Sequence, residues 1–363
     1  MPNENEKWMR RCIQLAKNGL KGAAPNPMVG AVIVCDGKII GEGYHVHCGE
    51  SHAEVNAIAS VCRRDLLKSS TMYVSLEPCS HHGKTPPCAD LIIREGIPHV
   101  VIGCIDPFAK VQGRGINKLR NASVKVTVGV CEEECLNLNR RFITYQTEHR
   151  PYVTLKWAQS ADGYIDYKRD NGAPIILSTP LTLTRVHRFR SENQAIMVGR
   201  RTAELDNPSL TVRYWSGKNP LRVVMDRYGR LNPLSAIFDG TVPTLVICDS
   251  SVRREIAIRY DGKNITAFSP DYNRNIISQI LSYLYELNIQ TLMVEGGARL
   301  LDGFIENDLW DEAYVEKTDY ILTDGVSAPV IDSDYISDVD DGLGTKTFCY
   351  RNFRVKNNTA VNS

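Results

Sequence analysis

The sequence lacks the features that would place it in a membrane or export it from the cell. It contains no run of roughly eighteen or more apolar residues, the length that a membrane-spanning helix requires. Its first residues, MPNENEKWMRRC, lack the apolar core of a secretory signal peptide. We therefore expect a cytoplasmic protein with no membrane partner.

An excess of charge of one sign is also missing. The chain has 43 Lys and Arg against 42 Asp and Glu, a net charge of +1, and it shows no basic block, internal repeat or low-complexity segment. A nucleic-acid-binding surface usually contains a cluster of basic residues. We therefore expect a small-molecule partner and no nucleic acid.

Cysteine, in contrast, is plentiful, with eleven residues in 363. Without an export signal, these cysteines are expected to be thiols or metal ligands in a reducing compartment. Seven of the cysteines outside the metal motif are interpreted as buried small residues, namely Cys12, Cys35, Cys48, Cys62, Cys104, Cys131 and Cys135.

The length of the chain predicts two domains, because 363 residues exceed one typical hydrophobic core. A break is predicted near residues 141–151, RFITYQTEHRP, where charged and polar residues lead to Pro151 and then to an apolar run. We place the first domain at residues 1–147 and the second at residues 151–363.

Strand-like and helix-like runs alternate in both parts. In the first, MVGAVIV and IIGEGYH flank an Asp-Gly turn, which indicates a hairpin, and HAEVNAIASVC and ADLIIREGI are expected helices. In the second, YVTLKWAQS, AIMVGR, LRVVMD and TLMVEGG are expected strands separated by helices, and the late runs DEAYVEKTDYIL and FCYRNFRVKN are expected to be partly antiparallel strands. This alternation predicts two α/β domains.

One stretch, LEPCSHHGKTPPC at residues 76–88, is typical of a metal site. Upstream of it, His52-Ala53-Glu54 begins a predicted helix. Zinc deaminases carry H-x-E followed by P-C-x-x-C. Two thiolates and one imidazole leave a fourth position for a water that zinc activates, and the carboxylate moves the proton.

The spacing departs from that pattern, because eight residues separate Cys79 from Cys88. An alternative is a closed structural zinc site made by Cys79, Cys88, His81 and His82. That alternative leaves the H-x-E segment unexplained.

The segments PNPMVGAVIV, GEGYH, SHAEVNAI, SLEPCSHHGKTPPC and IDPFAKVQGRGI together resemble the deaminase half of the bifunctional riboflavin-biosynthesis deaminase–reductase family. The long cysteine loop is that family's form of the motif. The resemblance implies a cytidine-deaminase-like three-layer domain that acts on a diaminopyrimidine carrying a ribosylamino phosphate. It assigns one zinc ion to His52, Cys79 and Cys88, proton transfer to Glu54, and substrate contacts to Asn26, His45, Lys84 and Asp106.

The segments YVTLKWAQSADGYI, VGRRTAELDNPSLTVR, LRVVMD and VEGGARLL resemble the reductase half of the same family. This implies a dihydrofolate-reductase-like fold that uses NADPH to reduce the ribosyl group to a ribityl chain. The resemblance assigns cofactor contacts to Ser160, Thr202, Asp206, Gly296 and Gly297. It assigns substrate contacts to Lys156, Arg190, Arg213 and Glu295.

The residues alone support the second assignment less specifically. Gly296 and Gly297 precede a helix-like run, where they could admit a phosphate or simply form a connecting turn. Arg200 and Arg201 could meet the extra phosphate of NADPH or could be solvated charges. Ile176 stands where family members often carry an aromatic residue.

We therefore interpret the chain as a bifunctional cytoplasmic enzyme of riboflavin biosynthesis that forms a homo-oligomer. Two alternatives stay open. One is a nucleic-acid deaminase whose second half is a binding domain, and the other is a zinc-stabilised nucleotide-binding protein without turnover.

Overall fold

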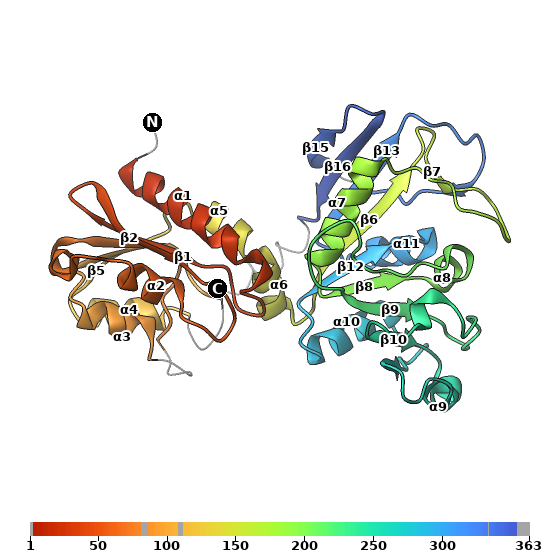
Figure 1. Cartoon of the computed structure of the whole chain (residues 1–363), viewed down its shortest axis with the longest axis horizontal. Helices are drawn as coiled ribbons and strands as arrows, with labels where there is room; N and C mark the ends of the chain where they lie inside the picture. Colours follow the sequence, from red (N-terminus) through yellow and green to blue (C-terminus); the bar gives the residue numbers. More distant parts are fainter. Residues whose placement is uncertain (1–2, 81–85, 108–111, 333, 354–363) are drawn as a thin grey trace. The chain divides into compact units, whose positions relative to one another are not determined.

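The computed structural model describes residues 3–80, 86–107, 112–332 and 334–353. The chain divides into two compact units, Met1–His149 and Arg150–Ser363 (Figure 1). In each unit a sheet is covered by helices, so the predicted α/β class is confirmed for both. Within the described ranges, no helix is both long and apolar enough to cross a membrane.

The first unit is built on a five-stranded sheet in the order β2-β1-β3-β4-β5. Its strands are β1 (Gly30–Cys35), β2 (Lys38–Tyr44), β3 (Thr71–Leu76), β4 (His99–Cys104) and β5 (Lys125–Val128). Strand β1 is antiparallel to β2 and β3, whereas β3, β4 and β5 run parallel. The expected hairpin turns through Asp36 and Gly37, both at positive φ.

Helices cover both faces of this sheet (Figure 1). One face carries α1 (Glu4–Ala16) and α5 (Glu132–Leu138), and the other carries α2 (Ala53–Ala59), α3 (Cys88–Arg94) and α4 (Arg114–Asn121). Successive residues of a strand point to opposite faces. Accordingly, Ala31 and Ile33 join the core under α2 to α4, whereas Val32 and Val34 join the core under α1. This is the predicted three-layer arrangement; short 3-10 turns at Lys17–Lys21 and Arg64–Ser69 complete the unit.

The segment where we predicted an irregular break is helical over most of its length. Helix α6 runs over Arg140–Glu148 and buries Phe142 and Tyr145. These two aromatic residues are three positions apart and therefore share one face of the helix. The apolar Ile143 stands between them off that face and is only partly buried, so it concealed this pattern.

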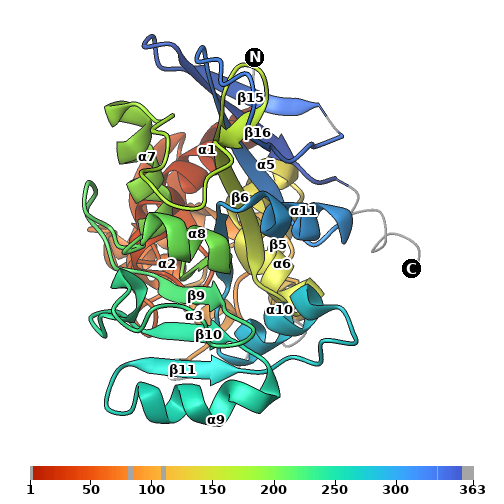
Figure 2. The same ribbon diagram turned by 90° about the vertical axis from the view of Figure 1, so that its right-hand side faces the viewer.

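The second unit contains a nine-stranded sheet in the order β11-β10-β9-β8-β12-β6-β13-β16-β15 and a small β14-β7 pair (Figure 2). In the order of the sheet, the seven strands from β11 through to β13 run parallel. Strand β16 is antiparallel to both β13 and β15, as we expected for the late segments of the chain. The strands are β6 (Tyr152–Gln159), β7 (Tyr164–Asp166), β8 (Ala195–Val198), β9 (Leu221–Met225), β10 (Thr244–Ile247), β11 (Ile265–Phe268), β12 (Thr291–Glu295), β13 (Glu312–Thr318), β14 (Val326–Ser327), β15 (Tyr335–Asp340) and β16 (Thr345–Arg351).

Two separate cores hold the helices of the second unit on its sheet. Helices α10 and α11 contribute Leu281 and Phe304 to one core, and α8 and α9 contribute Ala203 and Ile256 to the other. The helices are α7 (Pro180–Ser191), α8 (Arg200–Asp206), α9 (Ser250–Arg259), α10 (Ile276–Glu286) and α11 (Ala298–Glu306), with a 3-10 turn at Ala236–Phe238.

A buried ion pair fixes the start of the second unit. Arg150 donates to the two carboxylate oxygens of Asp311 at 2.6 and 2.9 Å, and Asp311 also accepts from the backbone N–H of Val153 at 2.7 Å. Both charged side chains are less than a tenth exposed. The pair therefore joins the first residues of β6 to the turn that precedes β13.

Replacing Asp311 with alanine should lower the free energy of unfolding of the second unit by roughly 3–5 kcal/mol, because Arg150 would stay buried without its counter-ion. Urea unfolding of the full chain measures this loss. The matched control is Lys168→Ala, which removes a surface pair with Asp324 whose side chains are 68% and 72% exposed. If both variants lose the same small amount of free energy of unfolding, the buried pair does not stabilise the unit.

Candidate functional site

Three metal-binding side chains meet at one end of the sheet in the first unit. His52 precedes α2, Cys79 follows β3, and Cys88 is the first residue of α3. The Nδ1 atom of His52 lies 3.6 Å from the sulfur of Cys79 and 3.4 Å from that of Cys88. Tetrahedral zinc, with bonds of about 2.3 Å to sulfur and 2.0 Å to nitrogen, would place these atoms roughly 3.5 Å apart. The donors therefore fit zinc, and in the described part of the chain no other group of this kind occurs.

The start of α3 holds the two sulfur atoms together. The backbone N–H of Cys88 donates to the sulfur of Cys79 at 3.3 Å, and that of Ala89 donates to the Cys79 carbonyl oxygen at 3.1 Å. The hydrogen bond from the Cys88 thiol lowers the pKa of Cys79 to about 4, and the same pairing raises the pKa of Cys88. A bound cation would favour the thiolate form of both, since metal binding displaces thiol protons.

Glu54 lies beside these ligands in the first turn of α2 and is only 3% exposed. Burial raises its pKa to about 7, and the nearby Cys79 thiolate adds to this rise. A carboxyl group with a pKa near the working pH can both accept and return a proton. Three protein ligands leave one tetrahedral position for water. The three donor groups and the buried carboxyl therefore fit the prediction of an open metal site with a proton carrier beside it.

Asn26 and His45 lie next to the ligand histidine. The rings of His45 and His52 meet edge to face, with centroids 5.3 Å apart. The Nδ1 atom of His45 is 3.1 Å from the carbonyl oxygen of Ser51, so this nitrogen carries the hydrogen and donates. Its Nε2 atom therefore accepts from the Asn26 amide at 3.1 Å. Burial lowers the pKa of His45, which favours the neutral ring and this pattern of bonds.

Asp106 is buried, and its position depends on Glu77, a residue that the sequence analysis missed. The Glu77 carboxylate accepts from the backbone N–H groups of Asp106, Gly113 and Gly115 at 3.4, 3.0 and 2.9 Å. A Cβ atom on Gly115 would lie 2.0 Å from the carbonyl oxygen of Pro78, so only glycine fits there. A signal was present, because Glu77 is a charged residue directly after the apolar run TMYVSL.

His81, His82 and Lys84, which the sequence analysis also considered, lie outside the described residues. The donor atoms of His52, Cys79 and Cys88 meet without the two histidines. The closed structural site therefore stays an alternative that metal analysis must decide.

In the second unit, the predicted substrate residues include Arg190 on α7, Lys156 on β6 and Glu295 at the end of β12. Arg190 on α7 donates to both carboxylate oxygens of Glu295 at 2.9 and 2.6 Å. Lys156 on β6 lies opposite Glu295 on the neighbouring parallel strand β12. Although burial favours the neutral acid, Arg190 and then Lys156 lower the pKa of Glu295. The structure thus brings these three residues together as charged groups.

Arg213 joins this group through Thr211. Its guanidinium lies 3.1 Å from the Thr211 hydroxyl, whereas Arg190 donates to the Thr211 carbonyl oxygen at 3.2 Å. The backbone N–H of Arg213 donates to Nδ1 of the buried His187 at 2.9 Å. Burial is the main cause that lowers the pKa of His187 to about 4, so the ring stays neutral and can accept this bond. His187 is another residue that the sequence analysis did not identify.

The predicted cofactor glycines open the N-terminus of α11. Gly296 and Gly297 have φ values of 73° and 78°. A Cβ atom on Gly297 would lie 3.1 Å from the Thr202 hydroxyl oxygen, so this glycine and Thr202 are neighbours, as the resemblance implied. Because the two glycines have no side chains of their own, they leave the backbone N–H groups at this helix start accessible, which suits a phosphate. These residues fit a dinucleotide cofactor.

The other two predicted cofactor residues are held by partners within the unit. Ser160 donates to Asp162 at 2.6 Å and accepts from the backbone N–H of Tyr164 at 2.9 Å. Asp206 forms an ion pair with Arg169, although burial raises its pKa. Both side chains are engaged, and their roles toward a cofactor remain predictions.

Arg200 and Arg201 are paired with acidic neighbours at the surface. Arg200 lies 2.7 Å from Glu204, and Arg201 lies 2.7 Å from Asp170. Solvated charges account for this arrangement, and exposed pairs of this kind are weak enough to exchange for a ligand. Ile176, at the position of the family aromatic residue, is 85% exposed.

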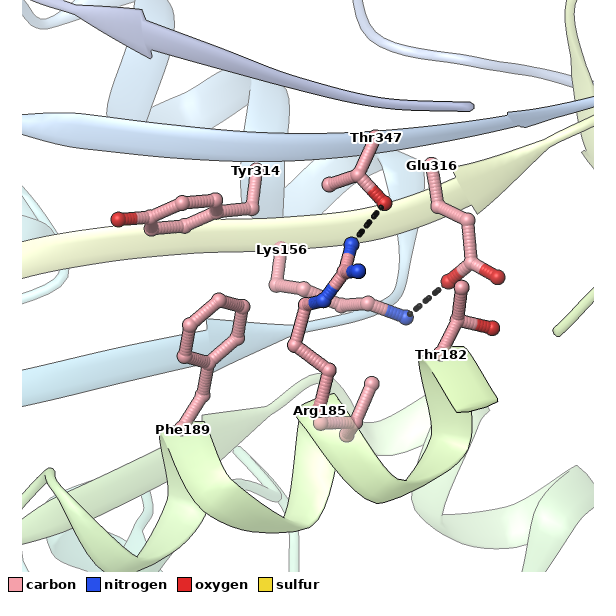
Figure 3. Close-up of a pocket in the computed structure, with 8 residues that line it drawn as sticks. Lys156, Thr182, Arg185, Phe189, Tyr314, Glu316 and Thr347 are labelled. Atoms are coloured by element: carbon pink, nitrogen blue, oxygen red, sulfur yellow. Dashed lines mark hydrogen bonds and ion pairs between the residues drawn. The ribbon is translucent and has the colours of Figure 1, made fainter. Parts of the chain in front are cut away.

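A further residue missed from the sequence is Glu316 on β13. Its carboxylate lies 3.3 Å from the ammonium group of Lys156 and accepts from the Ser178 hydroxyl at 3.0 Å. Figure 3 shows the carboxylate and the ammonium group facing one another across from α7. Within EAYVEKT no pattern distinguishes this glutamate from an ordinary polar strand position.

Comparison with known proteins matches both halves of the chain. Residues 2–104 match the cytidine and deoxycytidylate deaminase zinc-binding region, and residues 151–319 match the RibD C-terminal domain. Riboflavin biosynthesis protein RibD of Aquifex aeolicus is 40% identical over 89% of each chain. The protein of that name from Escherichia coli is 33% identical over 86% of this chain and 87% of its own.

Solved structures agree with these matches. A diaminohydroxyphosphoribosylaminopyrimidine deaminase/5-amino-6-(5-phosphoribosylamino)uracil reductase from Thermotoga maritima is 36% identical to this chain. It superimposes with a TM-score of 0.83 and covers 96% of this chain and 98% of its own.

Single variants can separate the two kinds of zinc site. His52→Ala, Cys79→Ala and Cys88→Ala should each lose most bound zinc, because each removes one of three protein ligands. His81→Ala and His82→Ala serve as controls and should retain about one zinc ion per chain. Metal analysis of the purified variants measures this. Loss of zinc from either control, together with its retention in His52→Ala, would establish the closed structural site instead.

Proposed function

The chain belongs to the RibD family of riboflavin biosynthesis proteins, and from this we propose that it catalyses two consecutive reactions of that pathway. The first is the zinc-dependent hydrolytic deamination of 2,5-diamino-6-(5-phosphoribosylamino)pyrimidin-4-one. The second is the NADPH-dependent reduction of the ribosyl side chain to ribityl. The observation that carries the proposal is the meeting of His52, Cys79 and Cys88 beside the buried Glu54.

In the deaminase half, some residues of the site bind the metal or the substrate, and Glu54 transfers protons. His52, Cys79 and Cys88 would hold the zinc ion, which would lower the pKa of a bound water toward about 7. Glu54 accepts one proton from the attacking water and passes it to the ring nitrogen, and then carries the second proton of that oxygen to the amino group, which leaves as ammonia. The Asn26 amide offers a donor and an acceptor, which suits a pyrimidine edge.

In the reductase half, the charged group on α7, β6 and β12 suits a sugar phosphate. Gly296 and Gly297 would hold NADPH, which would supply the hydride when bound. Lys156 and Arg190 hold Glu295 as a carboxylate, which can accept hydrogen bonds from sugar hydroxyls. The guanidinium of Arg213 can hold a phosphate group.

We further propose a cytoplasmic homo-oligomer with a deaminase domain at residues 1–147 and a reductase domain at 151–363. No disulfide joins the eleven cysteines, all of which lie in the described ranges, and this suits a reducing compartment. The edge strand β15 exposes Tyr335, Ile336 and Val339, and an apolar edge of this kind favours pairing with another chain. Sedimentation velocity of the full chain distinguishes a monomer from an oligomer.

Turnover of the pyrimidine phosphate tests the proposed function. Without NADPH, the purified zinc-loaded protein should release ammonia and accumulate the deaminated ribosyl compound. With NADPH, it should oxidise the cofactor and form the ribityl product. Binding of the pyrimidine phosphate without ammonia release would favour the nucleotide-binding alternative. Deamination of a single-stranded oligonucleotide, with no turnover of the pyrimidine phosphate, would favour the nucleic-acid alternative.

Glu54→Gln should keep zinc and lower the rate of deamination by at least about 10²–10⁴-fold, because an amide cannot accept the proton of the water at neutral pH. Ammonia release measures the effect. The internal control is reduction of already deaminated substrate by the same variant, which should be unchanged. Near-normal deamination would assign the proton transfer to another group.

A further inference from the structure

A narrow pocket lies between α7 and the sheet of the second unit (Figure 3). Its volume is about 10 Å³, room for a single water or hydroxyl group. Its polar and charged lining comes from both sides, with Thr182 and Arg185 on α7 and Lys156, Glu316 and Thr347 on the strands.

Glu316 lines this pocket, and one of its carboxylate oxygens receives no hydrogen bond from the described residues. The Oε2 atom of Glu316 lies 3.3 Å from the Lys156 ammonium and accepts from the Ser178 hydroxyl at 3.0 Å. The Oε1 atom is fully buried and has no partner in the described part of the chain. The side chain of Glu316 is only 2% exposed. A buried anionic acceptor of this kind is costly unless a donor reaches it.

The pocket adjoins the group to which we assign the substrate. In the strand register, Lys156 lies between Glu295 on β12 and Tyr314 on β13. Glu316 is two residues beyond Tyr314 and therefore points to the same face of the sheet. Lys156 is thus flanked by two carboxylates on one face, and Arg185 adds a second cation to the pocket. This charge pattern suits an anionic, hydroxylated ligand.

We propose that Glu316 is a specificity-determining residue of the reductase. Its Oε1 atom accepts a hydrogen bond from the 2′- or 3′-hydroxyl of the substrate's ribosyl group, and its Oε2 atom positions Lys156 for the same substrate. The inference rests on the proposed reductase function. The size of the pocket admits one hydroxyl, and a hydroxyl bound to a carboxylate forms a strong hydrogen bond.

Substrate analogues test this role. The deaminated ribosyl substrate and its 2′-deoxy and 3′-deoxy analogues are compared in NADPH-dependent reduction by the wild type, Glu316→Gln and Glu316→Ala. The wild type should prefer the full substrate over one analogue by about tenfold to a hundredfold in kcat/KM, the range expected for a hydrogen bond to a charged group. Glu316→Ala should bring that ratio close to one, and the nearly isosteric Glu316→Gln should give a value in between.

Glu312→Gln is the matched control. Glu312 lies on the same strand and face and is 1% exposed, but both of its oxygens have protein partners, Arg351 at 3.4 Å and the Tyr314 hydroxyl at 3.3 Å. This variant should keep the wild-type ratio even where its melting temperature falls. An unchanged ratio in both Glu316 variants, or a wild type that accepts both analogues as well as the full substrate, overturns the inference while leaving the reductase function intact. A wild type that does not reduce the full substrate overturns the proposed function itself.

Discussion

The deaminase half depends on one constraint, the close approach of α2 to the hairpin strand β2. A Cβ atom on Gly41 would lie 2.5 Å from the carbonyl oxygen of Ala57, and one on Gly43 would lie 2.4 Å from its backbone nitrogen. The helix therefore rests directly on the strand backbone, which explains both glycines of GEGYH. This contact fixes the helix that carries His52 at its start and Glu54 in its first turn, opposite the cysteines that follow β3.

The reductase half depends instead on charged side chains that form ion pairs with one another on one face of its sheet. Arg190 forms a buried ion pair with Glu295, and Lys156 forms one with Glu316. Few other groups are available to balance these charges. Such pairs add little to stability because desolvation offsets their attraction. Their value is orientation, since each charged group is fixed before a substrate arrives. The Oε1 atom of Glu316, which has no partner among the described residues, is where we propose that the substrate completes a hydrogen bond.

The sequence predicted the elements and the residue types of the metal site, because both depend on local patterns. Alternating apolar runs gave the strands, and the H-x-E and cysteine segments gave the ligands that the structure brings together. It did not predict Glu77 or Glu316, since their roles arise from backbone groups and side chains far away in the chain. The helix over Arg140–Glu148 was missed for another reason, because the apolar Ile143 stands between Phe142 and Tyr145 and conceals their helical spacing. Ser160 and Asp206 are bonded to other residues of the unit, and a cofactor would have to replace those bonds. Neither the sequence pattern nor the fold determines such an exchange.

The central claim is that zinc occupies an open, catalytic site beside Glu54. A crystal structure of the zinc-loaded chain, with anomalous diffraction at the zinc edge, tests it most directly. We expect one zinc ion bound to His52, Cys79 and Cys88, with a water or hydroxide as the fourth ligand within hydrogen-bonding distance of the Glu54 carboxylate. A fourth position filled by His81 or His82, with Glu54 facing away, would contradict the account.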